Sequence, residues 1–157
     1  MDLHDEILIA LRRITRAIDL HSRKVLKSSG LTGPQLVVLH ALKVNGDLYP
    51  SSIARIASLS QATISTILDR LQAQNLVTRE RCKEDRRQIL VSLTAEAHER
   101  LKTAPELLQA GFLRGFARLE SWEQLQLLSS LQRLAELMDA DDLDAAPILE
   151  VGDIEER

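Results

Sequence analysis

Apolar side chains recur at steps of three and four residues along most of this chain, and they alternate at every second residue only between residues 76 and 93. The first spacing places apolar side chains on one face of a helix, and the second places them on one face of a strand. Aromatic residues make up only 3% of the chain, whereas strand-rich folds usually use more of them. The spacing therefore predicts a mainly α fold with a small β-hairpin.

The N-terminal part is predicted to form two helices. Residues 5–28 carry an apolar stripe with basic side chains between its members, which indicates an amphipathic helix that ends at Gly30. A second helix is predicted from Thr32 to about Val44, because Thr32 and Gln35 have the spacing of a capping box.

Two short helices follow, separated by about three residues. The first is predicted at residues 51–57, and Ser60 is a suitable N-cap for the second. The second helix has an apolar face made by Ile64, Ile67, Leu68 and Leu71. The positions that face outward are polar and nearly uncharged, and they are Gln61, Ala62, Ser65, Thr66, Asp69 and Arg70, with Thr63 at the margin.

The hairpin is predicted to have short strands and a charged connection. One strand contains Val77 and Thr78, and the other carries the alternating residues between Ile89 and Leu93. The connection, residues 79–87, has five basic and three acidic side chains. Its net charge of +2 makes it a basic arm beside the two short helices.

The C-terminal part is predicted to be helical with one interruption. Thr94 caps a helix that begins near Ala95, and Pro105 is expected to kink or break it. Ser121 and Gln124 repeat the capping-box spacing and open a last helix.

The net charge of −3 conceals an uneven distribution along the chain. Residues 1–93 carry 14 basic and 9 acidic side chains, whereas residues 94–157 carry 6 and 14. A basic region beside an acidic tail is typical of nucleic-acid-binding proteins, although a solvated surface gives the same counts. The acidic C-terminal tail, residues 139–157, is interpreted either as a solvated end or as a segment that folds against a dimer.

Several classes of protein are disfavoured. No apolar run approaches the roughly 18 residues of a membrane span, and the N-terminus is acidic, so we expect a cytoplasmic protein without a membrane partner. No nucleophile elbow, phosphate loop or metal signature is present. We therefore predict neither catalysis nor a cofactor, metal ions included.

The histidines and the single cysteine suggest two weaker hypotheses. His4, His21, His40 and His98 lack the spacing of a helical metal site, although His40 and His98 could approach each other between packed helices. Cys82 lies among basic side chains, a setting that favours thiol oxidation. Ordinary structural roles are the alternative for all five residues.

Two short helices with a polar face on the second suit insertion into a DNA major groove, and a basic hairpin beside them suits contact with phosphates and the minor groove. Helix pairs of this kind also occur in purely structural bundles. The alternative function is a helical protein-interaction module whose basic hairpin binds an acidic partner.

The chain resembles the MarR family of winged helix-turn-helix regulators between about residues 30 and 100. The motifs that carry the resemblance are Ile53-Ala54-Arg55-Ile56-Ala57, Leu59-Ser60-Gln61-Ala62-Thr63-Ile64-Ser65, Leu68-Asp69-Arg70-Leu71, Asp85-Arg86-Arg87 and Val91-Ser92-Leu93-Thr94. Ala97 departs from the glycine that many relatives have there, and a helix interior accepts alanine readily.

The resemblance implies a single MarR-like domain over residues 1–140. Its winged helix-turn-helix core would occupy about residues 32–94, and its dimerisation helices would be residues 1–30 and 95–138. The apolar stripes of these terminal segments agree with a homodimer interface, although such stripes are also common in ordinary cores.

The resemblance also implies which residues meet DNA. The helix after Ser60 would enter the major groove, Arg87 would enter an adjacent minor groove, and Asp85 would orient the arginines of the hairpin. The predicted DNA-binding residues are Ser60, Gln61, Ala62, Thr63, Ser65, Thr66, Arg70, Arg79, Lys83, Asp85, Arg86 and Arg87. The alternatives are a solvated hairpin tip and a plain polar helix surface. Family members that sense oxidation use an N-terminal cysteine, which this chain lacks.

The function implied is that of a sequence-specific regulator, a repressor that binds a pseudo-palindromic site in double-stranded DNA as a homodimer. A small-molecule effector is left open as a further partner. A narrower resemblance, to repressors of compatible-solute (ectoine-type) synthesis, would place osmotic-response genes under its control. The stretches that carry it are Ile18-Asp19-Leu20-His21-Ser22, Leu31-Thr32-Gly33-Pro34-Gln35-Leu36, Ser129-Ser130-Leu131-Gln132-Arg133 and Asp142-Leu143-Asp144-Ala145-Ala146-Pro147.

Overall fold

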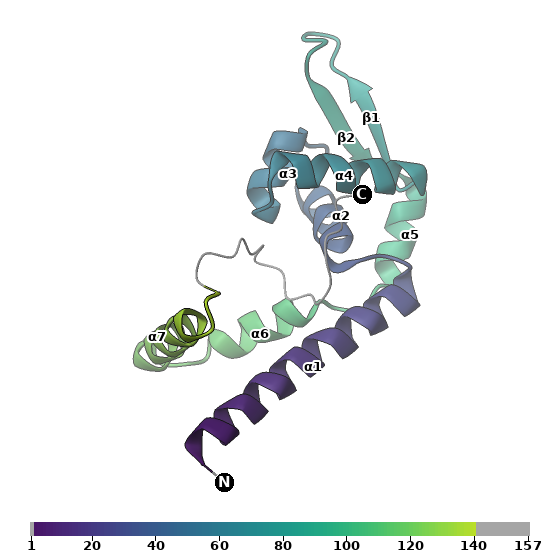
Figure 1. Ribbon diagram of the computed structural model, residues 1–157. Coiled ribbons are helices and arrows are strands. Elements are labelled where there is room, and N and C mark those ends of the chain that lie inside the picture. The colour runs from purple at the N-terminus through teal and green to yellow at the C-terminus, as the bar shows by residue number, and fades with distance from the viewer. Residues whose placement is uncertain (1, 141–157) are drawn as a thin grey trace. The chain divides into compact units, whose positions relative to one another are not determined.

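A computed structural model describes residues 2–140 and confirms a mainly helical fold with one antiparallel hairpin (Figure 1). The helices are α1 (Leu3–Ser29), α2 (Gly33–Asn45), α3 (Pro50–Ala57), α4 (Gln61–Ala73), α5 (Ala95–Thr103), α6 (Leu108–Phe116) and α7 (Ser121–Leu137). The strands are β1 (Val77–Arg81) and β2 (Ile89–Leu93). The described residues form two compact units, one ending at Pro105 and the other beginning at Glu106. Most of the predicted acidic tail lies outside the described residues.

The core of the first unit is built around α2, which packs against α1, α3, α4, α5 and β2. Eight of the 13 residues of α2 are buried, so this helix is apolar on nearly all sides, as a central helix must be. Fully buried side chains come from every part that surrounds it, including Ile53, Ile64, Leu71 and Val77. Burial of each such side chain stabilises the fold by roughly 1.5–3 kcal/mol. This shared core holds α3, α4 and the hairpin against α2.

Local signals in the sequence set several of these boundaries as predicted. Gly30 has a φ of +68° and ends α1 in the left-handed conformation that glycine adopts readily. The Thr32 hydroxyl accepts the Gln35 backbone N–H at 3.4 Å, and the Gln35 side chain accepts the Thr32 N–H at 3.0 Å. The predicted break at Pro105 is confirmed, because α5 ends at Thr103 and α6 begins at Leu108.

Two predicted boundaries were wrong. The N-cap of α7 is Glu120, not Ser121, because Glu123 accepts the Glu120 backbone N–H at 2.8 Å. The side chain of Gln124, the predicted capping partner, instead donates to the carbonyls of Phe116 and Leu119 at 3.0 and 3.2 Å.

The second error is in the hairpin, where β1 continues through Arg81 although the sequence suggested that the charged connection begins at residue 79. Pairing with the apolar strand β2 overrides the weak strand preference of charged side chains. Leu48 adds a short bridge to the other edge of β2, with backbone hydrogen bonds to Val91 at 2.9 and 3.1 Å.

The terminal helices keep much of their apolar surface exposed. In α1, only Val25 and Ser29 are buried among its residues, and Leu3, Ile14 and Leu26 are at least half exposed. No residue of α6 or α7 is buried. The exposed apolar side chains of α7 are Trp122, Leu125, Leu127, Leu128, Leu131 and Leu137. None of the described helices is long and apolar enough to span a membrane.

Candidate nucleic-acid interface

The turn between α3 and α4 presents the N-terminus of α4 to solvent. Ser58 ends α3 in the left-handed conformation, with a φ of +53°, and the Leu59 N–H donates to the Ala54 carbonyl at 3.0 Å. The Ser60 hydroxyl then accepts the Thr63 N–H at 3.1 Å, which confirms Ser60 as the N-cap of α4. This cap satisfies one of the free N–H groups that begin every helix.

The outward face of α4 divides into side chains that are engaged locally and side chains that are not. The Ser60 and Thr63 hydroxyls lie 2.7 Å apart, and the Thr66 hydroxyl donates to the Ala62 carbonyl at 3.2 Å. Gln61 and Ser65 are exposed, and within the described part of the chain no hydrogen bond engages their side chains. Gln61 and Ser65 are therefore the two members of this face with free donors and acceptors.

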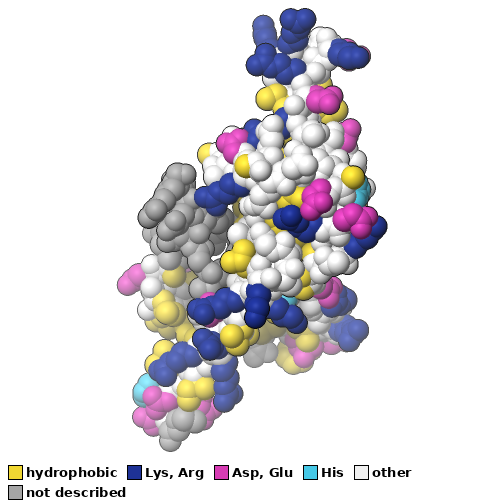
Figure 2. All heavy atoms as spheres, turned by 90° about the vertical axis from the view of Figure 1, so that its right-hand side faces the viewer, with side chains coloured by type: hydrophobic (Ala, Val, Ile, Leu, Met, Phe, Trp, Pro, Cys, Tyr) yellow, Lys and Arg dark blue, Asp and Glu magenta, His cyan; other side chains and the backbone are white. Residues whose placement is uncertain are grey.

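The hairpin projects away from the helices beside α4 (Figure 1). Its register pairs Val77 with Leu93 and Arg81 with Ile89. The hairpin tip, residues 82–88, is closed by hydrogen bonds from Cys82 N–H to the Gln88 carbonyl and from Gln88 N–H to the Asp85 carbonyl, both 3.0 Å. Lys and Arg side chains gather at the far end of the hairpin, at the top of Figure 2.

Three cations at the tip, Lys83, Arg86 and Arg87, are exposed and form no ion pair with any described residue. Asp85 accepts the backbone N–H of Arg87 at 3.0 Å and does not contact a guanidinium. The carboxylate thus shapes the turn through the backbone, whereas the sequence suggested a direct pair with an arginine side chain. The tip thus carries three unpaired cations beside two acidic side chains, Glu84 and Asp85, and has a net charge of +1.

Arg79 is placed differently from the tip cations. Its guanidinium Nη2 contacts the Asp69 carboxylate of α4, its side chain is only 20% exposed, and its Nε is buried without a hydrogen-bond partner. The sequence suggested that Arg79 meets DNA. Contact of Arg79 with DNA stays a prediction. Within the chain, its guanidinium links β1 to α4, which sequence spacing could not reveal because the two residues come from different elements.

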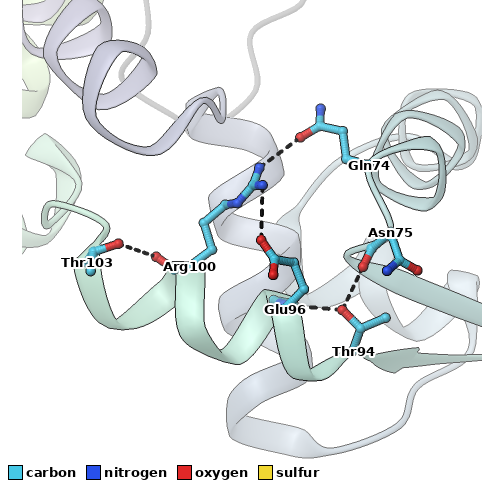
Figure 3. A network of polar contacts seen from close by, with 7 residues as sticks. Gln74, Asn75, Thr94, Glu96, Arg100 and Thr103 are labelled. Carbon is cyan, nitrogen blue, oxygen red and sulfur yellow. Dashed lines mark hydrogen bonds and ion pairs between the residues drawn. The ribbon is translucent and has the colours of Figure 1, made fainter.

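A polar network fastens the root of the hairpin to the end of α4 (Figure 3). The Thr94 hydroxyl donates to the Asn75 carbonyl at 2.8 Å and accepts the Ala97 N–H at 3.1 Å, which confirms Thr94 as the cap of α5. Arg100 contacts both Gln74 and Glu96 at 3.3 Å. The network fixes the direction in which the hairpin leaves α4.

Tyr49 was not among the residues predicted from the sequence to be functional. Its hydroxyl lies 3.8 Å from the Cys82 thiol, and this contact, with smaller effects from Glu84 and Asp85, raises the pKa of Tyr49. Tyr49 also lines a surface hollow of about 270 Å³ with Pro50, Ser51, Arg87, Gln88 and Ile89.

The histidines do not form a buried metal site in the part of the chain that the structure describes. His4 lies with Asp2 and Asp5 in an exposed cluster at the start of α1. His40 has a lowered pKa, first because of partial burial and then because of nearby Lys43.

Comparison with known proteins agrees with this geometry. Residues 29–88 match the model of the MarR family. The chain is 29% identical over 140 residues to the HTH-type transcriptional repressor MdtR of Bacillus subtilis, a match that covers 89% of this chain and 90% of that protein. This chain has a winged-helix fold and is similar to the MarR family over residues 29–88. Its relatives are transcriptional regulators and not enzymes.

Solved structures of MarR-type proteins share the fold. A MepR-like protein complexed with pseudoligands aligns with a TM-score of 0.61 and 26% identity, covering 88% of this chain and 97% of that one. Reduced AbfR bound to DNA aligns with a TM-score of 0.54 and 25% identity, covering 87% and 94%. In this fold, α3 and α4 correspond to the helix-turn-helix and the hairpin corresponds to the wing.

Proposed function

We propose that this protein is a MarR-type regulator that binds double-stranded DNA with α4 in the major groove and the hairpin tip against an adjacent minor groove. The observation that carries the proposal is the set of three unpaired cations, Lys83, Arg86 and Arg87, on a rigidly rooted hairpin beside a polar helix face. Free cations on a projecting tip, in a chain of net charge −3, favour contact with a polyanion there. AbfR, a protein of similar fold, was solved bound to DNA, which supports DNA as the partner.

We propose a division of tasks among the predicted DNA-binding residues. Gln61 and Ser65 have free polar groups on α4 and are proposed to read base edges, since a Gln amide can pair with adenine in the major groove. Arg87 is proposed to enter the minor groove, because a guanidinium suits its narrow, negative channel. Lys83 and Arg86 would contact phosphates.

The other members of the predicted set act through local structure in this proposal. Ser60 caps α4, Asp85 shapes the tip, and Arg79 holds the hairpin to α4. The remaining members, Ala62, Thr63, Thr66 and Arg70, flank the reading positions on α4.

We further propose that the regulator is a homodimer whose single domain, residues 1–140, associates through the terminal helices at 1–30 and 95–138. In the described part of the chain no residue of α6 or α7 is buried and α7 exposes six large apolar side chains, and contiguous exposed apolar surface is typical of association surfaces. Two copies related by a two-fold axis would place two α4 helices about one turn of DNA apart. The expected site is therefore pseudo-palindromic.

The test is a fluorescence-anisotropy titration with duplex DNA from upstream of the protein's own gene and with random duplex of the same length, at several salt concentrations. Arg87→Ala is expected to weaken binding to the upstream duplex by about 1–3 kcal/mol and to lower the slope of log affinity against log salt by about 0.9. Arg118→Ala, an exposed arginine outside the hairpin, is the matched control and should change neither value. Equal affinity for both duplexes would refute the proposal and favour an acidic protein partner.

The biological role proposed is repression of genes for osmotic adaptation. MdtR, a relative over most of the chain, is named as a repressor, and the four sequence stretches cited above resemble repressors of compatible-solute synthesis. Deleting the gene should raise transcripts of compatible-solute synthesis genes at low osmolarity, and footprinting should place the protein on their upstream DNA. Unchanged transcript levels and the absence of a footprint would contradict this biological role. They would not contradict the proposal that the protein binds DNA.

A small-molecule effector is proposed as a further partner, since the MepR-like protein of the same fold was solved with pseudoligands. Thermal-shift measurements with small aromatic and aliphatic acids provide the first check, and a raised melting temperature together with weaker DNA binding would identify an effector. No shift with any compound, while DNA binding persists, would count against regulation by acids of this kind.

A further inference from the structure

The face of α1 opposite its apolar stripe is strongly basic. Its members, here called the basic face of α1, are Arg12, Arg13, Arg16, Arg23, Lys24 and Lys27. At 3.6 residues per turn they lie within about one third of the helix circumference and extend over about 22 Å of its length. All six are exposed, whereas Ile18 and Val25 on the opposite side are half-buried and buried.

Little within the described residues neutralises this face. Asp19 is its one acidic neighbour on α1, with carboxylate oxygens 3.6 Å from Arg16 and 3.0 Å from Arg23. Arg12, Arg13, Lys24 and Lys27 form no ion pair with any described residue. Between residues 12 and 27 the helix carries six basic side chains and one acidic one, a net charge of +5.

The chain also contains an acidic segment of nearly equal and opposite charge. Residues 141–157 carry seven carboxylates and one arginine, a net charge of −6. The whole chain has a charge of −3, so residues 1–140 carry +3 without this segment. Fully extended, residues 141–157 span at most about 55 Å, which exceeds the length of about 40 Å expected for the 27-residue helix α1.

We infer that the acidic segment, residues 141–157, docks on the basic face of α1. Opposite charges attract, and a covalent tether raises the effective concentration of the segment to about the millimolar range, which an unlinked acidic partner does not reach at ordinary protein concentrations. The apolar stripe of α1 points the other way and is left for the proposed dimer. The docked segment neutralises a second basic surface that would otherwise compete with the hairpin for DNA.

The decisive experiment measures contact directly and needs no DNA. A nitroxide spin label is attached at Val151→Cys in the full chain with Cys82→Ser, and paramagnetic broadening of backbone amide signals is recorded by NMR. Amides of residues 12–27 are expected to lose about half of their intensity or more at about 0.05 M salt and to recover it at about 0.5 M, because salt screens exposed charges. Broadening confined to α4 and the hairpin, or spread evenly over the chain, would overturn the inference.

Two variants and a control test whether charge causes the contact. The tail variant replaces its acids by amides through Asp141→Asn, Asp142→Asn, Asp144→Asn, Glu150→Gln, Asp153→Asn, Glu155→Gln and Glu156→Gln. The α1 variant carries Arg12→Gln, Arg13→Gln, Lys24→Gln and Lys27→Gln. Both should abolish the broadening, and the control Arg118→Gln should retain it. Broadening that persists in both variants would show that charge does not hold the segment.

A second measurement rests on the proposed DNA binding. The tail variant is expected to bind random duplex several-fold more tightly than the wild type, since an uncovered basic face adds phosphate contacts. Combining it with the α1 variant should remove the gain. If the tail variant binds random duplex no more tightly than the wild type, while NMR still shows the acidic segment on α1, the competition with DNA would be overturned. If no variant binds any duplex, only the proposed function would be refuted.

Discussion

The ion pair between Asp69 and Arg79 leads to opposite predictions for the two roles that Arg79 can have. In the structure Arg79 holds the hairpin to α4, and its side chain is only 20% exposed. In this role Asp69→Ala and Arg79→Ala both loosen the hairpin and both weaken DNA binding. If Arg79 instead contacted a phosphate, Asp69→Ala would release the guanidinium and remove a negative charge, so DNA would bind more tightly.

The size of the effect follows from the exposure of the two side chains. Asp69 is 67% exposed, so solvent screens the pair, and its coupling energy is expected to be about 0.5–1 kcal/mol. Arg79→Ala also removes an aliphatic stem that packs against the protein, which brings its total cost to about 1–2 kcal/mol of unfolding free energy. Asp69→Ala should cost less, about 1 kcal/mol.

The assay is urea unfolding of the wild type, both single variants and the double variant at one protein concentration, together with DNA titrations over a range of salt. A linking role leaves the slope of log affinity against log salt unchanged, whereas loss of a phosphate contact lowers it by about 0.9. The reasoning is refuted by a coupling energy of zero, or by Asp69→Ala strengthening DNA binding.

Three further predictions concern the cap of α4, the terminal helices and a histidine. Ser60→Ala should lower the unfolding free energy, measured by urea unfolding, by about 1 kcal/mol through loss of the N-cap, and Ser60→Asp should restore most of this loss. Equal stability of Ser60→Ala and the wild type would contradict the role of the 3.1 Å hydrogen bond between Ser60 and Thr63. Leu128 and Leu131 are more than half exposed on α7, and the double variant Leu128→Glu, Leu131→Glu should convert a dimer to a monomer in light scattering. The control pair Gln126→Glu, Gln132→Glu on the same helix should leave the dimer intact. A dimer that survives both pairs would exclude α7 from the interface. The pKa of His40 is lower in the folded state than in the unfolded state, so the unfolded state binds more protons near pH 6. The contribution of His40 to stability is therefore present above pH 6.5 and is lost as the pH falls through the folded-state pKa. His40→Gln should therefore flatten unfolding free energy against pH between about 7.5 and 5, and an unchanged profile would contradict this assignment.

Interactions between residues close in sequence could be predicted, and those between distant elements could not. Thr32, Ser60 and Thr94 were recognised as caps because the partner of each lies three residues ahead, a distance fixed by helix geometry. The break at Pro105 is equally local, since proline lacks an N–H and fixes its own φ. These signals sufficed for the order and type of nearly all elements.

The pairing of Arg79 with Asp69 depends on how β1 lies beside α4, and no spacing rule carries that information. The bridge between Leu48 and Val91 and the contact of Tyr49 with Cys82 join residues more than thirty positions apart. At Glu120 the error was local, because the capping box is formed by Glu120 and Glu123, one residue earlier than the predicted pair of Ser121 and Gln124. The sequence therefore predicted which residues surround the site more reliably than what each one contacts.

No residue of helices α6 and α7 is fully buried, so in the proposed dimer the folding of residues 106–140 would depend on protein concentration. Such helices gain most of their stability from tertiary packing, and here the packing surface would come from a second molecule. Dilution of the proposed dimer would thus cost the chain both its partner and the order of its C-terminal helices, and an unpaired copy would become a preferred substrate for proteolysis. Turnover of single copies would then set a lower limit on the amount of regulator that the cell can keep.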